Sequence, residues 1–84
     1  MKEIKCILLG VDTVLVTEVE AIEPENPGEP ECELTKPYEI DEEGELTPWP
    51  RGSEGNVMRV HSYNILTMVD AKADVVAKYK ELTS

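Results

Sequence analysis

Apolar and polar residues follow a strand-like pattern over most of the chain. Residues 2–9 form a short, largely apolar run that ends at a glycine, and residues 13–22 are rich in β-branched types, with polar and apolar residues alternating in their second half. An alternation with a period of two is typical of a strand that has one face in water. The two segments predict a hairpin that turns at residues 10–12.

Prolines and glycines mark where this hairpin ends. Residues 23–30 hold three prolines and one glycine, which remove backbone donors and fix φ, so a loop is predicted there. A third strand is predicted over residues 31–40, where Pro37 requires either an edge position or a bulge. Turn residues follow at 41–44, and residues 45–47 are expected to return antiparallel to the third strand.

The last third of the chain predicts two strands and a helix. The strands are expected at residues 56–60 and 65–69. Asp70 is a suitable helix N-cap, and residues 71–82 place apolar side chains at the spacing of an amphipathic helix. This helix needs an apolar surface on which to dock.

Short strands without intervening helices predict a small antiparallel barrel. We expect the barrel over residues 2–69 and the helix over 70–82, as a single domain of residues 1–84. Because phenylalanine is absent, the core must be built mainly from Val, Ile, Leu and Met. A core this small is often completed by burial between copies of the chain.

The two cysteines, Cys6 and Cys32, are too few for the disulfide framework of a small secreted domain. No apolar stretch approaches the roughly 20 residues of a membrane span, and the N-terminal apolar run is shorter than a signal-peptide core. We therefore expect a soluble, cytoplasmic protein with reduced thiols and no membrane association.

The net charge of −10 argues against an extensive phosphate-binding surface, because such surfaces depend on Lys and Arg. The acidic residues are unevenly distributed, however. Residues 18–46 hold twelve acidic residues and one basic residue, whereas the rest of the chain holds six acidic and seven basic residues. Nearly all of the acidity belongs to one hairpin region, so another face remains able to meet an anion.

No group of residues predicts catalysis or a cofactor. His61 is the single histidine, and no nucleophile-elbow sequence accompanies it. The glycines match neither dinucleotide-binding nor P-loop spacing, and the acidic run lacks the spacing of a calcium loop. We predict a protein that is not an enzyme and has no catalytic residues, metal or cofactor.

Two aromatic residues carry contrasting expectations. Trp49 lies between two prolines, where a rigid exposed ring would serve as a stacking platform or an interface anchor. The alternative for Trp49 is a core residue that closes the barrel. Tyr79 lies on the apolar stripe of the predicted helix and is expected in the core.

The motifs LTKPYEI (34–40), LTPWP (46–50) and VMRVHSYNILTMVD (57–70), followed by a helix that bears Tyr79, resemble small Sm-like proteins of marine cyanophages and ocean metagenomes. The resemblance implies a mainly β fold: a strongly bent, five-stranded antiparallel Sm-like (SH3-like) barrel, here with a C-terminal helix. It also implies a cyclic homo-oligomer of about five to seven subunits, joined edge strand to edge strand. A phage-encoded protein would act in the host cytoplasm.

The resemblance further implies a nucleic-acid site. The second Sm motif, apolar-Arg-Gly-x-Asn-apolar, can be laid on residues 60–65, which places His61 at the arginine position. Histidine offers a stacking surface but is largely neutral at pH 7. Sm rings hold RNA near the loops after the third and fourth strands. The candidate residues are therefore Lys36, Tyr38, Arg59, His61 and Asn64.

Two functions follow from these observations. The first is an Sm-like ring with a role in phage RNA or DNA processing, which binds single-stranded RNA or DNA by base stacking on Tyr38 or His61. Stacking contributes on the order of 1–3 kcal/mol per base and tolerates any sequence, which suits a protein with few cations. The second is a ring-shaped protein-interaction module whose acidic hairpin recruits a basic protein partner.

Overall fold

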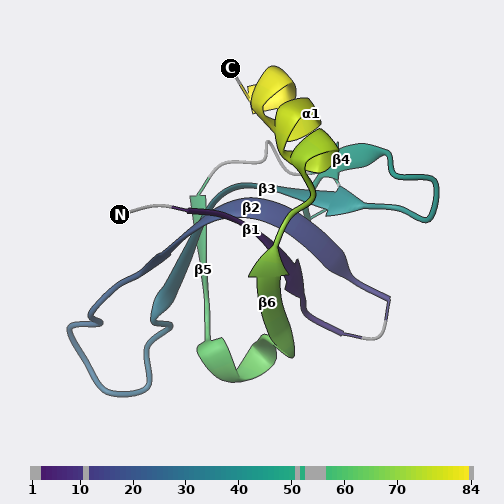
Figure 1. Ribbon diagram of the computed structural model, residues 1–84. Helices are drawn as coiled ribbons and strands as arrows, with labels where there is room; N and C mark the ends of the chain where they lie inside the picture. Colours follow the sequence, from purple (N-terminus) through teal and green to yellow (C-terminus); the bar gives the residue numbers. More distant parts are fainter. Residues whose placement is uncertain (1–2, 11, 51, 53–56, 84) are drawn as a thin grey trace.

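The computed structural model describes residues 3–10, 12–50, 52 and 57–83. Its elements are β1 (Glu3–Leu8), β2 (Val14–Ala21), β3 (Cys32–Ile40), β4 (Leu46–Pro48), β5 (Val57–Val60), the 3-10 turn η1 (Ser62–Asn64), β6 (Thr67–Asp70) and helix α1 (Ala73–Thr83). All strand pairs are antiparallel, and α1 follows the sheet at the C-terminal end of the chain (Figure 1). The predicted mainly β fold with a C-terminal helix is confirmed.

The sheet is open and has six strands, where the sequence analysis expects a closed barrel of five. The strand order is β4-β3-β2-β1-β6, and β5 also pairs with β3. β4 returns antiparallel along the last residues of β3, as predicted for residues 45–47. β5 and β6 form opposite borders and do not pair with each other within the described residues, because η1 carries the chain across to β1 before β6 begins.

A bulge interrupts the pairing of β2 with β3. Thr17 of β2 faces two residues of β3, Lys36 and Pro37. Lys36 has a φ of 54°, in the left-handed region that side-chain-bearing residues rarely adopt. Pro37 has no backbone N–H to donate. At the bulge, the β2–β3 ladder requires no hydrogen bond from this residue. The sequence predicted either an edge position or a bulge for Pro37, and the structure has the bulge.

The core lies on one face of the sheet. Its centre is made of aliphatic side chains from three strands, namely Ile7, Leu15, Val19 and Leu34. Trp49 is half-buried and packs against this cluster. The sequence left open whether Trp49 is an exposed platform or a core residue, and in the structure it packs against the core.

Helix α1 contacts the opposite face of the sheet. Successive side chains of a strand point to opposite faces, so Val16 points away from the face on which Leu15 is buried. Tyr38 pairs with Val16 across the ladder, and its ring contacts Tyr79 of α1. Tyr79 is only 1% exposed, which confirms its expected place in the protein interior.

The predicted N-cap of the helix is wrong. Asp70 is the last residue of β6, and α1 begins at Ala73 rather than at residue 71. The carboxylate of Asp70 accepts a hydrogen bond from Lys5 Nζ at 2.5 Å. The Asp70 side chain, which was expected to cap the helix, therefore binds Lys5 of the neighbouring strand β1 instead.

Candidate functional site

The turn η1 presents an aromatic pair between β5 and β6. The rings of His61 and Tyr63 are stacked, with centroids 4.8 Å apart and planes inclined by 29°. Two backbone hydrogen bonds of 3.0 Å, from Asn64 N–H to His61 O and from Ile65 N–H to Ser62 O, hold the turn. Tyr63 is 76% exposed, so its ring is largely open to solvent.

The loop between β2 and β3 fixes this turn from a distant part of the sequence. His61 Nε2 lies 2.8 Å from the carbonyl oxygen of Gly28. A carbonyl only accepts, so Nε2 carries the proton. The carboxylate of Glu31 accepts a hydrogen bond from the backbone N–H of Ser62. This bond lowers the pKa of Glu31, because it stabilises the charged form.

Two further candidate residues lie around the same turn. Arg59 is on β5, and its Nε is 3.5 Å from a carboxylate oxygen of Glu33. The Arg59 side chain is 58% exposed, so solvent screens the pair and the guanidinium stays accessible. Asn64 is exposed at the end of η1. Both side chains are therefore available near the stacked rings.

The other two candidates, Lys36 and Tyr38, contact helix α1. Lys36 Nζ donates to the carbonyl oxygen of Thr83 at 3.1 Å, where a cation complements the negative end of the helix dipole. The ring of Tyr38 packs edge-to-face on Tyr79, with centroids 5.8 Å apart. In this structure both side chains help to hold the helix against the sheet.

The five candidate residues therefore fall into two groups. In the β3–β5 ladder Cys32 pairs with Val60 and Thr35 with Val57, so His61 and Lys36 lie beyond opposite ends of the ladder. At a rise of roughly 3.3 Å per residue, about 13 Å of strand separates Lys36 from Cys32. Arg59, His61 and Asn64 lie within six residues of one another near one end of this ladder, whereas Lys36 and Tyr38 lie beyond the other end.

The hydroxyl of Tyr79 occupies the bulge beside Lys36. It lies 2.9 Å from the carbonyl oxygens of both Thr35 and Lys36, which share its single proton, and it accepts the N–H of Glu18 at 3.2 Å. Burial raises the pKa of Tyr79 to about 12. This tyrosine is a structural link between helix and sheet, and its hydroxyl is fully engaged.

The sheet borders expose apolar side chains. On β5, Val57 is 56% exposed, and on β6, Val69 is 51% exposed. Leu66, just before β6, is 63% exposed. Within the described residues each border strand has a partner on one side only. Such borders are able to pair with a strand of another chain.

The sequence analysis did not single out Tyr63 or Leu66. The only sequence feature that points to Tyr63 is its position two residues after His61, in a segment that is too short for a strand. Spacing alone does not show that Tyr63 stacks on His61, because that contact depends on the 3-10 turn. Tyr63 is nevertheless the most exposed aromatic residue near the candidate site.

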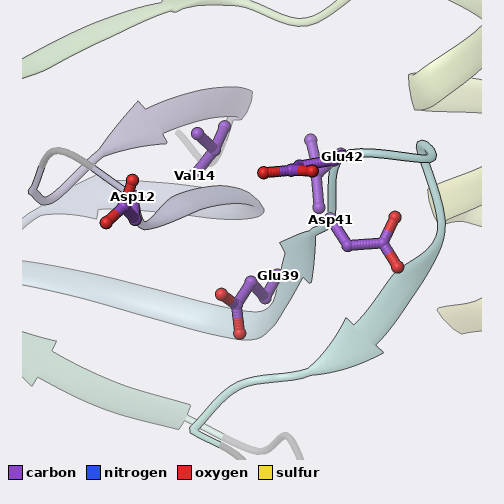
Figure 2. A pocket seen from close by; sticks show the side chains of 6 residues that line it. Asp12, Val14, Glu39, Asp41 and Glu42 are labelled. Atoms are coloured by element: carbon purple, nitrogen blue, oxygen red, sulfur yellow. The ribbon is translucent and has the colours of Figure 1, made fainter.

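An acidic hollow of about 420 Å³ lies between the β1–β2 turn and the β3–β4 hairpin (Figure 2). It is lined by Asp12, Val14, Glu39, Ile40, Asp41 and Glu42. In Figure 2 the carboxylates of Asp12, Glu39 and Glu42 lie around the hollow, whereas that of Asp41 points toward the hairpin turn. The carboxylate of Asp41 accepts the N–H groups of Glu43 and Glu45 there, at 2.9 and 2.8 Å.

Among the described residues, no group of three or more His, Cys, Asp or Glu side chains is placed to hold a metal ion. No helix within the described ranges is long and apolar enough to cross a membrane.

An open antiparallel sheet, a C-terminal helix and an aromatic turn between the border strands define a small, mainly β domain. Residues 2–84 match a protein family described as a family of unknown function, DUF6561, and the chain belongs to that family. No curated protein and no solved structure matches the chain.

Proposed function

We propose that the protein is a self-assembling, Sm-like β-domain whose copies close into a ring that binds single-stranded RNA or DNA through the η1 turn. One observation carries the proposal: the two borders, β5 and β6, lack outer partners within the described residues and expose apolar side chains. Pairing β5 of one copy with β6 of the next would satisfy both borders.

The border side chains are arranged consistently with this pairing. Val57 pairs with Thr35, the neighbour of buried Leu34, and Val69 pairs with Cys6, the neighbour of buried Ile7. Because side chains alternate along a strand, both valines lie on the face of the sheet opposite the core. In a sheet that continues from one copy to the next, they would meet on one face and shield each other from water.

Joining β5 to β6 is a head-to-tail contact, since two different borders meet. Such contacts build rings when the rotation between copies closes, and filaments when it does not. Pairing β5 with β6 around a ring leaves neither strand with a free border, whereas the outer edge of β4 stays unpaired within the described residues. The free thiols Cys6 and Cys32 support action in the cytoplasm.

Nucleic acid would bind at the turn that links the two borders. The exposed face of Tyr63, stacked on His61, offers a platform for a base, and Arg59 offers a cation for a phosphate. A single base contributes on the order of 1–3 kcal/mol by stacking, and a ring repeats the platform in every subunit. Asn64 belongs to this site, whereas Lys36 and Tyr38 lie outside it.

Two measurements test the proposal. Multi-angle light scattering should give a multiple of the subunit mass, and a monomer mass at about 100 µM would contradict the ring. Fluorescence anisotropy at low salt should show binding of labelled oligo-U or oligo-dT. We expect Tyr63→Ala and His61→Ala to weaken that binding and Leu82→Ala, at an exposed apolar position on α1, to leave it unchanged. No binding at about 100 µM protein would remove the nucleic-acid role.

A second candidate function is recruitment of a basic protein partner by the acidic hairpin region. The hollow of Figure 2 favours it, because Asp12, Glu39 and Glu42 gather around one concave surface. No ion pair neutralises these three carboxylates within the described residues. The acidic charge of the protein favours this second function over the first. The hollow and the η1 turn are different surfaces, so one protein is able to perform both functions.

A further inference from the structure

A second hollow lies between the start of helix α1 and the sheet. It has a volume of about 440 Å³ and an apolar floor made of Cys6, Ile40, Val69 and Val75. Cys6, Ile40 and Val69 come from three strands and Val75 from the first turn of the helix. The floor thus combines residues from four separate segments of the chain, so its shape depends on how α1 docks.

The docking of the helix explains why this floor is uncovered. Tyr79 anchors α1 at the bulge, and Val75 lies one turn earlier on the same side of the helix. Val75 is only half-buried, whereas Tyr79 is buried. The first turn of α1 therefore stands away from the sheet, and aliphatic surface remains exposed between them.

The rim of this hollow is mostly acidic. Its charged lining consists of Asp41, Glu42, Asp70 and Asp74, with Lys72 as the single cation among the described lining residues. Asp70 is paired with Lys5, whereas no ion pair involves Glu42 or Asp74 within the described ranges. An apolar floor with this rim suits an apolar group that carries positive charges beside it.

The hollow adjoins the acidic one described above, since both are lined by Ile40, Asp41 and Glu42 of the β3–β4 hairpin. The two adjoining hollows are hereafter called the α1 groove, and their lining residues extend from the β1–β2 turn to the start of α1. An extended segment several residues long would meet apolar surface at one end and carboxylates along its length.

We propose that the α1 groove binds a basic segment of a partner protein, with one aliphatic side chain seated on the floor and lysine or arginine side chains on the rim. This inference rests on the second candidate function and gives it a site and a partner chemistry. A second copy of this chain is a poor occupant of the acidic rim, because its 18 acidic residues outnumber its 8 basic ones, whereas the ring contact proposed above joins backbone groups and apolar side chains. The rim repels the phosphates of a nucleic acid for the same reason.

The binding test uses two labelled peptides that differ at one position. The first has a central leucine flanked by lysines on both sides, and the second has alanine in place of the leucine. Titrated into the full chain at low salt, the leucine peptide should bind about tenfold more tightly, because leucine buries apolar surface that alanine lacks. Val75→Ser should reduce that preference, whereas Leu82→Ser, at an exposed apolar position on α1, should preserve it.

A matched pair of charge variants tests the rim. Glu42→Gln with Asp74→Asn removes two rim carboxylates, and Glu23→Gln with Glu25→Gln removes two exposed carboxylates from the β2–β3 loop. Both changes raise the net charge equally. We expect the rim variant to weaken binding of the leucine peptide about tenfold and the loop variant to change it less than about threefold.

Methyl NMR on the unmodified chain provides a readout that does not depend on variants. The leucine peptide should shift the methyl signals of Ile40 and Val75 and leave those of Leu82, at an exposed position on α1, unchanged. Equal binding of the two peptides, equal loss in both charge variants, or shifts elsewhere would overturn the α1 groove and leave charge-driven recruitment standing. Failure of both peptides to bind would overturn the second candidate function as well.

Discussion

The hydroxyl of Tyr79 donates a hydrogen bond toward the carbonyl oxygen of Thr35, 2.9 Å away, and so joins the C-terminal helix to the centre of the sheet. These residues are 44 positions apart in sequence. The bond falls at the bulge, where the β2–β3 ladder leaves backbone groups without their usual partners. The helix thereby supplies hydrogen-bond partners to backbone groups at the bulge, and it also covers one face of the sheet.

Removal of this hydroxyl should destabilise the fold. We expect Tyr79→Phe to lower the free energy of unfolding by about 1–3 kcal/mol, because the carbonyls of Thr35 and Lys36 and the Glu18 N–H lose their shared partner. Urea unfolding followed by circular dichroism measures the change. Tyr63→Phe is the matched control at an exposed position, and an equal loss in both variants would contradict the role given to Tyr79.

Stability should also decline at high pH. Burial raises the pKa of Tyr79 from 10.0 to about 12, so the folded state retains the phenolic proton that the unfolded state releases. The stabilisation is complete below pH 10.0 and is lost as the pH rises toward about 12. Urea unfolding across this range should show a steeper decline for the parent than for Tyr79→Phe. Parallel declines would argue against a buried phenol.

The left-handed backbone of Lys36 predicts an unusual substitution pattern. Lys36→Gly and Lys36→Val both remove the hydrogen bond from Nζ to the Thr83 carbonyl. The difference in stability between the two variants therefore reports the conformational preference of the backbone at this position. Glycine adopts a φ of 54° readily, whereas a β-branched residue does so with strain. We expect the glycine variant to be more stable by about 1 kcal/mol or more, measured by urea unfolding. A more stable valine variant would refute the bulge geometry.

The core should be sensitive to loss of volume at its centre. Leu34 is fully buried among Ile7, Leu15 and Val19, so Leu34→Ala should destabilise the protein by about 2–5 kcal/mol. Leu66→Ala, at a position that is 63% exposed, should change stability by less than about 0.5 kcal/mol. Thermal or urea unfolding of the two variants checks the contrast, and similar losses would place the core elsewhere.

A charge on the border should block assembly. We expect Val57→Lys to dissociate the oligomer, because it places an ammonium where the apolar side chains of adjoining copies would meet. Glu25→Gln changes the net charge by the same amount from an exposed loop position and should leave the mass in light scattering unaltered. Raising the salt concentration should strengthen assembly of the parent by screening repulsion between acidic subunits.

The strand positions were accessible from the sequence because they depend on local rules. The alternation of residues 13–22 and the punctuation by prolines place β2 (Val14–Ala21) within about one residue of its observed bounds. The burial of Tyr79 follows equally from helical spacing. Both predictions use neighbours in the sequence, where periodicity carries the information.

Contacts between distant residues were not accessible in this way. The Asp70 carboxylate has the chemistry of a helix cap, and only the register of β1 with β6 shows that Lys5 holds it instead. The distance between Lys36 and His61 within one chain was not accessible for a similar reason. Both lie next to loops in the sequence, but the β3–β5 ladder places them at opposite ends.

The division of one edge of β3 between two short strands has a consequence for how copies meet. β4 and β5 follow one another along that edge, with the kink at Lys36 and Pro37 between them. A bulge bends the strand that carries it, so β5 is tilted relative to the β3–β4 hairpin. If neighbours attach through β5, this tilt sets the angle between successive subunits and with it the circumference of the assembly.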